Sequence, residues 1–215
     1  MSVAAYFDLD GTVLRGHAER QFLLALARRR RIGVRALWRS LAVAARADAG
    51  PLALRWKANK TYLAGLPLPA VTEWAAECVR ERVWPRIAPA AVAAIARHRQ
   101  SGHRLVLLTG SLELLAIPVA QQLQMDDVLA TVVAVEAGRL SGRIVPPHPY
   151  GSGKRQALER HAAACGIDLA RSYAYADSAA DIPCLSAVGH PHLVNPSLRL
   201  ALWAGARDWP VLIWK

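Results

Sequence analysis

Acidic residues, cysteines and long apolar runs are all scarce in this chain. Its 215 residues include 16 Asp/Glu against 27 Lys/Arg and only three cysteines, although 53% of the residues are hydrophobic. The scattered cysteines argue against a disulfide framework or a zinc site, and they fit a reducing compartment. Charged residues interrupt every apolar stretch before the ~18 residues that a membrane span needs. No signal peptide is recognisable, so we expect a cytoplasmic protein with a sizeable hydrophobic core.

The excess of basic residues is concentrated in one segment. Residues 15–60 hold twelve Lys/Arg against two acids, whereas the rest of the chain is almost balanced. Basic amphipathic helices with tryptophans can lie on anionic membranes, and four tryptophans lie in or beside this segment: Trp38, Trp56, Trp74 and Trp84. A solvated helical surface around a tryptophan-containing bundle core has the same pattern. Both interpretations are open. A nucleic-acid partner is not expected, because no motif of a nucleic-acid-binding fold is present.

Hydrophobic periodicity divides the chain into a helical segment and an α/β segment. A short buried strand is predicted over residues 3–8, and helical periodicity then runs from about Glu19 to Trp84 in four stretches separated by Gly and Pro. After Pro85, strands and helices alternate, which predicts a parallel sheet covered on both faces. We therefore expect an α/β core of residues 1–15 and 85–215, with a helical domain of residues 16–84 inserted after the first strand.

Individual elements of the α/β segment follow from the same patterns. Helices are predicted over 90–100, over 112–124 with an interruption at Pro118, and over 154–165 with Gly166 as C-cap. Strands are predicted over 103–111, 172–177, 192–195 and 209–214, with a hairpin around 136–138.

Polar side chains occur where three of the predicted strands end. Asp8 and Asp10 follow the first strand, Thr109 and Ser111 follow the second, and Asp177 follows a later one, with Asp181 four residues on. In open α/β sheets, ligands bind beyond the carboxyl ends of the strands, so these groups can converge on one site. Taken singly, each has an ordinary interpretation as a turn residue or a helix N-cap.

Three carboxylates in one crevice require protonation or a cation. Hard oxygen ligands without His or Cys favour Mg²⁺. Together with Lys154 and a hydroxyl, such a cation would form a receptor for a phosphoryl group. One aspartate can then act as a nucleophile, and a second, two residues on, can transfer protons.

Four motifs carry a family resemblance: DLDGT (8–12), LLTGS (107–111), Lys154 and ADSAAD (176–181). They resemble the motifs of the haloacid dehalogenase (HAD) superfamily of phosphatases, and the helical insertion resembles its C1-type cap. The branch that the chain resembles most is the phosphoserine-phosphatase-like subfamily IB. The resemblance implies an α/β fold with a Rossmann-like parallel-sheet core and a helical-bundle cap. It also implies a Mg²⁺-dependent phosphomonoesterase that works through an aspartyl-phosphate.

The resemblance also implies a role for each motif residue. Asp8 would be the nucleophile and a metal ligand, and Asp10 the general acid/base and a metal ligand through its carbonyl oxygen. Thr109, Lys154 and the Gly110 backbone would hold the phosphoryl group, with Ser111 beside them. Asp177 would bind Mg²⁺ directly, and Asp181 would support the metal site.

Three positions depart from phosphoserine phosphatases. Those enzymes have a substrate-contacting glutamate nine residues after the nucleophile, where this chain has His17, with Glu19 two residues on. Those enzymes also carry an arginine in the cap, and near that position this chain has Asn59. Their second motif usually contains Ser-Gly-Gly, where this chain has Thr-Gly-Ser. We therefore expect a small-molecule or lipid phosphate as substrate rather than phosphoserine. His17 is a candidate substrate contact, and His148 a candidate contact to the leaving group.

Other classes fit less of the sequence. GSGK (151–154) lacks the earlier glycine and the Ser/Thr after the lysine that a P-loop needs. A response-regulator receiver lacks the large helical insertion and the paired aspartates. A protein that binds anionic ligands or membrane surfaces through its basic helices is the alternative from another class. A phosphotransferase with the same chemistry is a further alternative.

Overall fold

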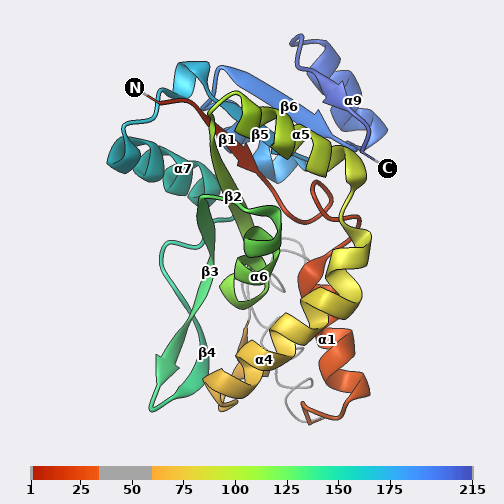
Figure 1. The fold of residues 1–215 in the computed structure, drawn as a ribbon, viewed down its shortest axis with the longest axis vertical. Helices are drawn as coiled ribbons and strands as arrows, with labels where there is room; N and C mark the ends of the chain where they lie inside the picture. The colour runs from red at the N-terminus through yellow and green to blue at the C-terminus, as the bar shows by residue number, and fades with distance from the viewer. Residues whose placement is uncertain (1, 34–59, 215) are drawn as a thin grey trace.

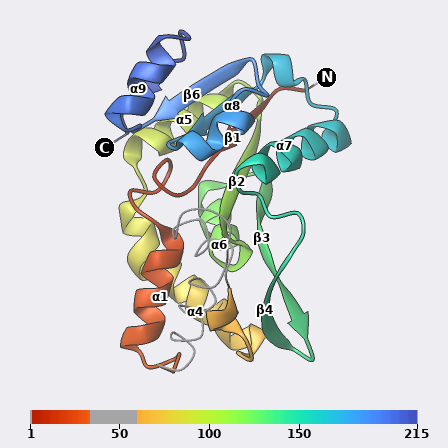
Figure 2. The same ribbon diagram turned by 180° about the vertical axis from the view of Figure 1, so that it is seen from behind.

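The computed structural model describes residues 2–33 and 60–214. Most of the sheet and its covering helices lie at one end of the molecule. Helices α1 (Ala18–Arg28) and α4 (Leu68–Cys78) extend toward the other end, as does the hairpin of β3 (Asp127–Glu136) and β4 (Arg139–Val145) (Figures 1 and 2). None of the helices in these ranges has both the length and the apolar character needed to cross a bilayer.

The described residues form one seven-stranded sheet in the order β4-β3-β2-β1-β5-β6-β7. All neighbouring strands are parallel except β3 and β4, which form the predicted hairpin. The strands are β1 (Ala4–Phe7), β2 (Arg104–Leu112), β3 (Asp127–Glu136), β4 (Arg139–Val145), β5 (Tyr173–Ala176), β6 (His190–Val194) and β7 (Val211–Leu212). The predicted α/β fold with a parallel-sheet core is confirmed.

Alternating side chains of the central strands pack on opposite faces of the sheet. Ala5 and Phe7 of β1 lie in one buried cluster with α5 (Pro89–Gln100) and α6 (Glu113–Leu123). Ala4 and Tyr6 lie in a second cluster with α7 (Ser152–Cys165), α8 (Ile182–Leu185) and α9 (Leu198–Gly205). Figure 1 shows α5 in front of the sheet, and Figure 2 shows α7 and α8 on the opposite side. Burial on both faces explains the apolar runs of the strands.

The interruption predicted at Pro118 is wrong, because α6 continues through it. Proline removes one backbone donor from a helix. Apolar packing offsets the loss of this hydrogen bond, since Leu115, Val119 and Leu123 of the same helix are all buried.

Two of the four predicted helices of segment 16–84 lie within the described residues. Helix α1 matches the first, and α4, with Pro69 in its first turn, matches the fourth. Helix α4 is followed by a π-helical turn (Val79–Val83) and a 3₁₀ turn (Trp84–Arg86). The second predicted helix and most of the third, with Trp38, Trp56 and Asn59, lie outside the described residues. The division into a core and a cap stays a prediction.

The last part of the third predicted helix is not α-helical. Residues Thr61–Leu63 form the short 3₁₀ helix η1, and Gly65 follows with a φ of 81°. The Gly65 N–H donates to the Leu140 carbonyl, so the chain pairs with the hairpin strand β4 at this point. Pairing with the hairpin and a left-handed glycine account for the absence of α-helix over residues 61–65.

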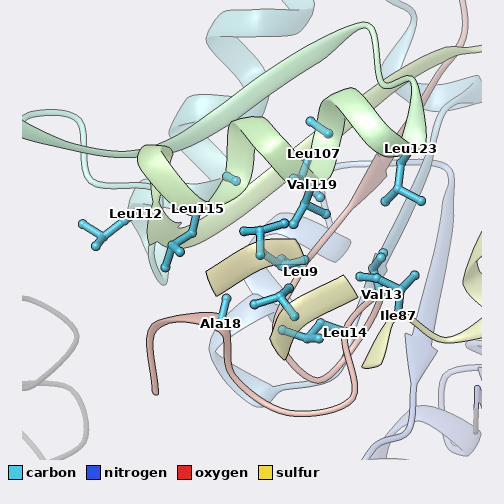
Figure 3. Close-up of a cluster of buried hydrophobic side chains, with 14 of the residues drawn as sticks. Leu9, Val13, Leu14, Ala18, Ile87, Leu107, Leu112, Leu115, Val119 and Leu123 are labelled. Carbon is cyan, nitrogen blue, oxygen red and sulfur yellow. The ribbon is translucent and has the colours of Figure 1, made fainter. Parts of the chain in front are cut away.

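A buried apolar cluster fixes the loop between β1 and α1. Leu9, Val13 and Leu14 of this loop pack with side chains of α6 and β2, and Ala18 at the start of α1 belongs to the same cluster (Figure 3). The loop that carries the paired aspartates is therefore anchored to the core.

Candidate active site

The charged residues of the site come from elements far apart in sequence. Asp8 directly follows β1, Asp177 directly follows β5, and Asp181 ends the short 3₁₀ turn Ala179–Asp181. Lys154 lies in the first turn of α7. Because β1 and β5 are parallel neighbours, their carboxyl ends lie at the same edge of the sheet.

Lys154 joins two buried carboxylates. Its Nζ lies 2.6 Å from Asp8 Oδ1 and 2.7 Å from Asp181 Oδ1. Ser178 donates a hydrogen bond of 2.6 Å to the other oxygen of Asp181. All three charged side chains are more than nine-tenths buried, so water screens their interactions little.

Asp8, Asp177 and Asp181 form a group of carboxylates suited to a metal ion. Each carboxylate offers one oxygen atom, and these three atoms lie within 4.8 Å of one another. A Cβ on Gly11, which has a φ of 79°, would collide with the Asp177 carboxylate, so this approach requires glycine. The donors are all hard oxygens, and Lys154 supplies one positive charge against three carboxylates. The residues therefore fit a divalent cation such as Mg²⁺.

The electrostatics of Asp8 reflect this excess of negative charge. Burial raises the pKa of Asp8 to about 7, Lys154 opposes the rise, and the neighbouring aspartates add to it. Burial by itself would lower the pKa of Lys154, but the carboxylates of Asp8 and Asp181 outweigh it and raise that pKa. Lys154 is therefore charged, and a further cation would favour the ionised form of Asp8.

Asp10 is held at both carboxylate oxygens. The N–H of Ala18 donates to Oδ1 over 2.8 Å, and the Ser111 hydroxyl donates to Oδ2 over 2.7 Å. The residue after Asp10 is held as well, since the Asn195 side chain donates to the Gly11 carbonyl over 3.1 Å.

The turn at the end of β2 is tied to β3. The Ser111 N–H donates to the buried Thr109 hydroxyl over 3.1 Å. Thr131 of β3 donates to the Gly110 carbonyl over 2.7 Å and lies 2.9 Å from His148 Nδ1. These contacts fix the orientation of the Gly110 peptide.

The remaining candidate residues lie where the helical segment begins. His17 is exposed at the N-cap of α1, where its side chain makes no capping hydrogen bond. Glu19 is buried, and both of its oxygens accept from Lys60 Nζ, at 2.7 and 2.6 Å. Its Oε1 also accepts from the Tyr62 hydroxyl at 2.6 Å.

The family model of haloacid dehalogenase-like hydrolases matches residues 5–186, a range that contains every carboxylate described above. The chain belongs to this family. The resemblance predicted from the four motifs is therefore confirmed, and the chain is an enzyme, a HAD-like phosphatase.

Three relatives of this HAD-like phosphatase match it along nearly its whole length. It is 35% identical to an inhibition of morphological differentiation protein of Streptomyces azureus, covering 97% of this chain and 77% of that one. It is 33% identical to a probable phosphatase of Mycobacterium tuberculosis, covering 97% and 74%. It is also 27% identical to phosphoserine phosphatase SerB1 of the same species, covering 98% of this chain and 70% of that one.

Solved structures support the HAD-like fold over the whole chain. A Bordetella pertussis protein of unknown function superposes with a TM-score of 0.85 at 28% identity, covering 99% of this chain and 98% of that one. A phosphoserine phosphatase solved as a phospho-aspartyl intermediate analogue gives a TM-score of 0.67 at 17% identity, covering 100% and 94%. The second similarity shows the fold alone.

The structure thus brings most of the predicted site residues of this phosphatase together. Asp8, Asp177, Asp181 and Lys154 form one cluster, and Asp10 contacts Ser111. Sequence reasoning missed Thr131, Ser178, Lys60 and Tyr62, which contact the predicted residues. Ser178 lies three residues before its partner Asp181, inside the ADSAAD motif. The partners of Thr131, Lys60 and Tyr62 lie 17 to 43 residues away along the chain and meet them only in the fold.

Proposed function

We propose that this phosphatase is a Mg²⁺-dependent phosphomonoesterase that works through an aspartyl-phosphate on Asp8. The observation that supports this best is the buried Asp8 carboxylate held 2.6 Å from Lys154 Nζ inside a group of further carboxylates. One Asp8 oxygen is oriented by the lysine, which leaves the other for attack on phosphorus.

Each residue then has a separate task. Asp8 forms a bond to phosphorus while the bond from phosphorus to the ester oxygen breaks. Asp10 gives a proton to the departing oxygen, which leaves as an alcohol. Asp10 then accepts a proton from the water that attacks the aspartyl-phosphate, releasing phosphate and restoring Asp8. Lys154, Thr109 and the Gly110 backbone hold the phosphoryl oxygens, with Ser111 beside them.

The metal site of this proposal consists of Asp8, Asp177, Asp181 and the Asp10 carbonyl. A bound Mg²⁺ would neutralise charge on the phosphoryl group and on the carboxylates. Lys154 orients the Asp8 and Asp181 carboxylates, and Ser178 orients the second oxygen of Asp181.

The proposed substrate is a small-molecule or lipid phosphate rather than phosphoserine. Glu19, the buried carboxylate nearest the start of the helical segment, is bound by Lys60 and Tyr62. A carboxylate that already carries an internal ammonium partner is not available to the amine of an amino-acid substrate. We further propose that residues 16–84 form the cap that selects the substrate.

A panel of phosphomonoesters tests the proposal. Phosphate release from amino-acid, sugar, nucleotide and lipid phosphates is measured with Mg²⁺ and with a chelator, beside Asp8→Asn. Metal-dependent release that Asp8→Asn lacks is expected. Release by Asp8→Asn at the rate of the unaltered protein would exclude Asp8 as the nucleophile. Preference for phosphoserine over every other ester would overturn the substrate assignment.

A further inference from the structure

Helix α1 begins in direct contact with Asp10. The N–H of Ala18, its first residue, donates to Asp10 Oδ1, and the Ser111 hydroxyl contacts Oδ2. A backbone N–H can only donate, whereas a hydroxyl can donate or accept. Oδ1 is therefore an acceptor in both protonation states of Asp10, and the transferable proton lies on Oδ2.

The next residue of α1 belongs to an enclosed polar cluster, which we call the Glu19 cluster: Glu19, Lys60 and Tyr62. Lys60 is fully buried, and its Nζ lies 2.7 and 2.6 Å from the two Glu19 oxygens. The Tyr62 hydroxyl donates to the same carboxylate over 2.6 Å. Burial and the Glu19 charge raise the pKa of Tyr62 well above its ordinary value, so its hydroxyl remains a donor.

The contact of Ala18 with Asp10 and the Glu19 cluster involve consecutive residues, and they constrain the start of α1 in different ways. Apolar packing of Ala18 in the core cluster fixes how deep the helix start lies, but such packing has no direction. Charge-assisted hydrogen bonds do define a direction. The Glu19 cluster supplies three of them within one residue of the Ala18 N–H.

We propose that the Glu19 cluster positions Asp10 for proton transfer by fixing the first turn of α1. The Ala18 N–H holds Oδ1, so that Oδ2 faces the ester oxygen and delivers its proton as the bond from phosphorus to oxygen breaks. The electron pair of that bond stays on the departing oxygen, which becomes the alcohol. This inference rests on the proposed function, and Glu19, Lys60 and Tyr62 are positioning residues in it.

The consequence depends on the leaving group. An alkoxide is a poor leaving group and needs the proton of Asp10, whereas p-nitrophenolate departs without one. The ratio kcat/KM reports the steps up to this departure. Misplacing Asp10 should therefore lower kcat/KM for an alkyl phosphate far more than for p-nitrophenyl phosphate.

The experiment compares n-butyl phosphate with p-nitrophenyl phosphate in three proteins altered near α1. Tyr62→Phe removes one hydrogen bond to Glu19. The double variant Glu19→Gln/Lys60→Met removes both charges together, so that neither is left unpaired in the interior. Glu77→Gln is the matched control, because Glu77 pairs with Arg29 and, over 2.8 Å, with Arg31, just beyond the far end of the same helix.

We expect the double variant to lose about tenfold or more in kcat/KM for n-butyl phosphate relative to its loss for p-nitrophenyl phosphate. Tyr62→Phe should shift the ratio in the same direction by a smaller factor, and Glu77→Gln should leave it unchanged. Equal losses for both substrates, or no loss for either, would overturn the inference. Thermal unfolding verifies that each protein is folded, and Tyr62→Phe decides the matter if the double variant is not.

Ala18→Pro tests the donor itself. Proline is favoured at the first position of a helix, and the preceding His17 already has the extended backbone (φ −127°, ψ 121°) that proline requires. The same substrate-selective loss is expected, and an unchanged ratio in the folded variant would contradict the role of this N–H.

If the unaltered protein hydrolyses neither ester, or if Asp8→Asn remains active, the proposed function itself fails. If the enzyme is active and depends on Asp8 but the ratio of kcat/KM for the two esters is unchanged in the variants, only this inference is overturned.

Discussion

Among single residues, Lys154 has the strongest influence on the charge balance of the site. It is the cationic partner of Asp8 and Asp181 at distances of 2.6 and 2.7 Å, and it is almost wholly buried. Removing one partner of a buried ion pair leaves the other charges uncompensated, which is more damaging than losing a surface pair.

Lys154→Met should therefore destabilise the metal-free protein by about 3 kcal/mol at pH 8, where Asp8 is ionised. Added Mg²⁺ should restore part of the loss, because a cation that binds the folded state stabilises it. Urea unfolding with and without Mg²⁺ measures both effects. Arg155→Met is the control, since the ion pair of Arg155 with Glu159 is exposed. Equal effects of the two substitutions would contradict the prediction.

Gly11 controls the approach of Asp177 to the proposed metal site. Gly11→Ala would place a methyl group against the Asp177 carboxylate, and we expect affinity for Mg²⁺ to fall by about tenfold, or about 1.4 kcal/mol. Isothermal titration calorimetry measures it. Gly102→Ala is matched for backbone strain, because Gly102 also has a positive φ (71° against 79°) but a Cβ there would meet nothing within 4 Å. If both variants bind Mg²⁺ equally well, contact with Asp177 is not the cause.

Among the elements, the β3–β4 hairpin supports the segment that carries Lys60 and Tyr62. Gly142 of β4 approaches η1 so closely that its Cβ would lie 2.9 Å from Thr61 Cα and 3.1 Å from the Lys60 carbonyl oxygen. The hairpin strand therefore fixes the position of the residues that bind Glu19.

Gly142→Ala should push η1 away from β4 and lower the free energy of unfolding by about 2 kcal/mol, from contact and backbone strain together. Gly138→Ala, in the turn of the same hairpin, has a similar φ (74° against 78°) but open space around its Cβ. Chemical denaturation of the pair separates contact from strain. A loss as large for Gly138→Ala would show that strain alone is responsible.

At the scale of the whole molecule, a group of aromatic and histidine side chains joins α5 to β5 and β6. His98 Nε2 lies 2.8 Å from the Tyr175 hydroxyl, and its Nδ1 lies 2.8 Å from His103 Nδ1. Burial lowers the pKa of His98 to about 4, and His103 and His192 add to the decrease. The folded protein therefore keeps His98 neutral where the unfolded chain would protonate it.

This group should make the fold sensitive to acid. The ordinary pKa of His98 is 6.5 and the folded one about 4, so the unfolded state binds more protons between these values. Its contribution to stability is complete above pH 6.5 and is lost as the pH falls toward 4. His98→Asn should show a shallower decline of unfolding free energy across this window. Parallel declines for the two proteins would exclude His98 as the cause.

The sequence by itself determined the fold class, the order of most elements and the candidate residues of the site. Apolar runs bounded by Gly and Pro marked the strands. Asp8, Asp10 and Asp177 follow strands of a sheet whose parallel order places their ends together, and Thr109 lies within the last residues of β2. Those patterns are local in the chain. A parallel sheet brings the residues at the carboxyl ends of its strands close together, so the local patterns are enough to predict their proximity.

Only the tertiary structure decided which groups touch. The pairing of Glu19 with Lys60, the bond of Thr131 to the Gly110 carbonyl, and the continuation of α6 through Pro118 all depend on packing between distant segments. Local sequence does not encode such contacts, because burial and the partner of a polar group are properties of the folded chain. The composition of segment 16–84 favoured a basic surface, yet its one fully buried lysine became visible only in the fold of the described residues.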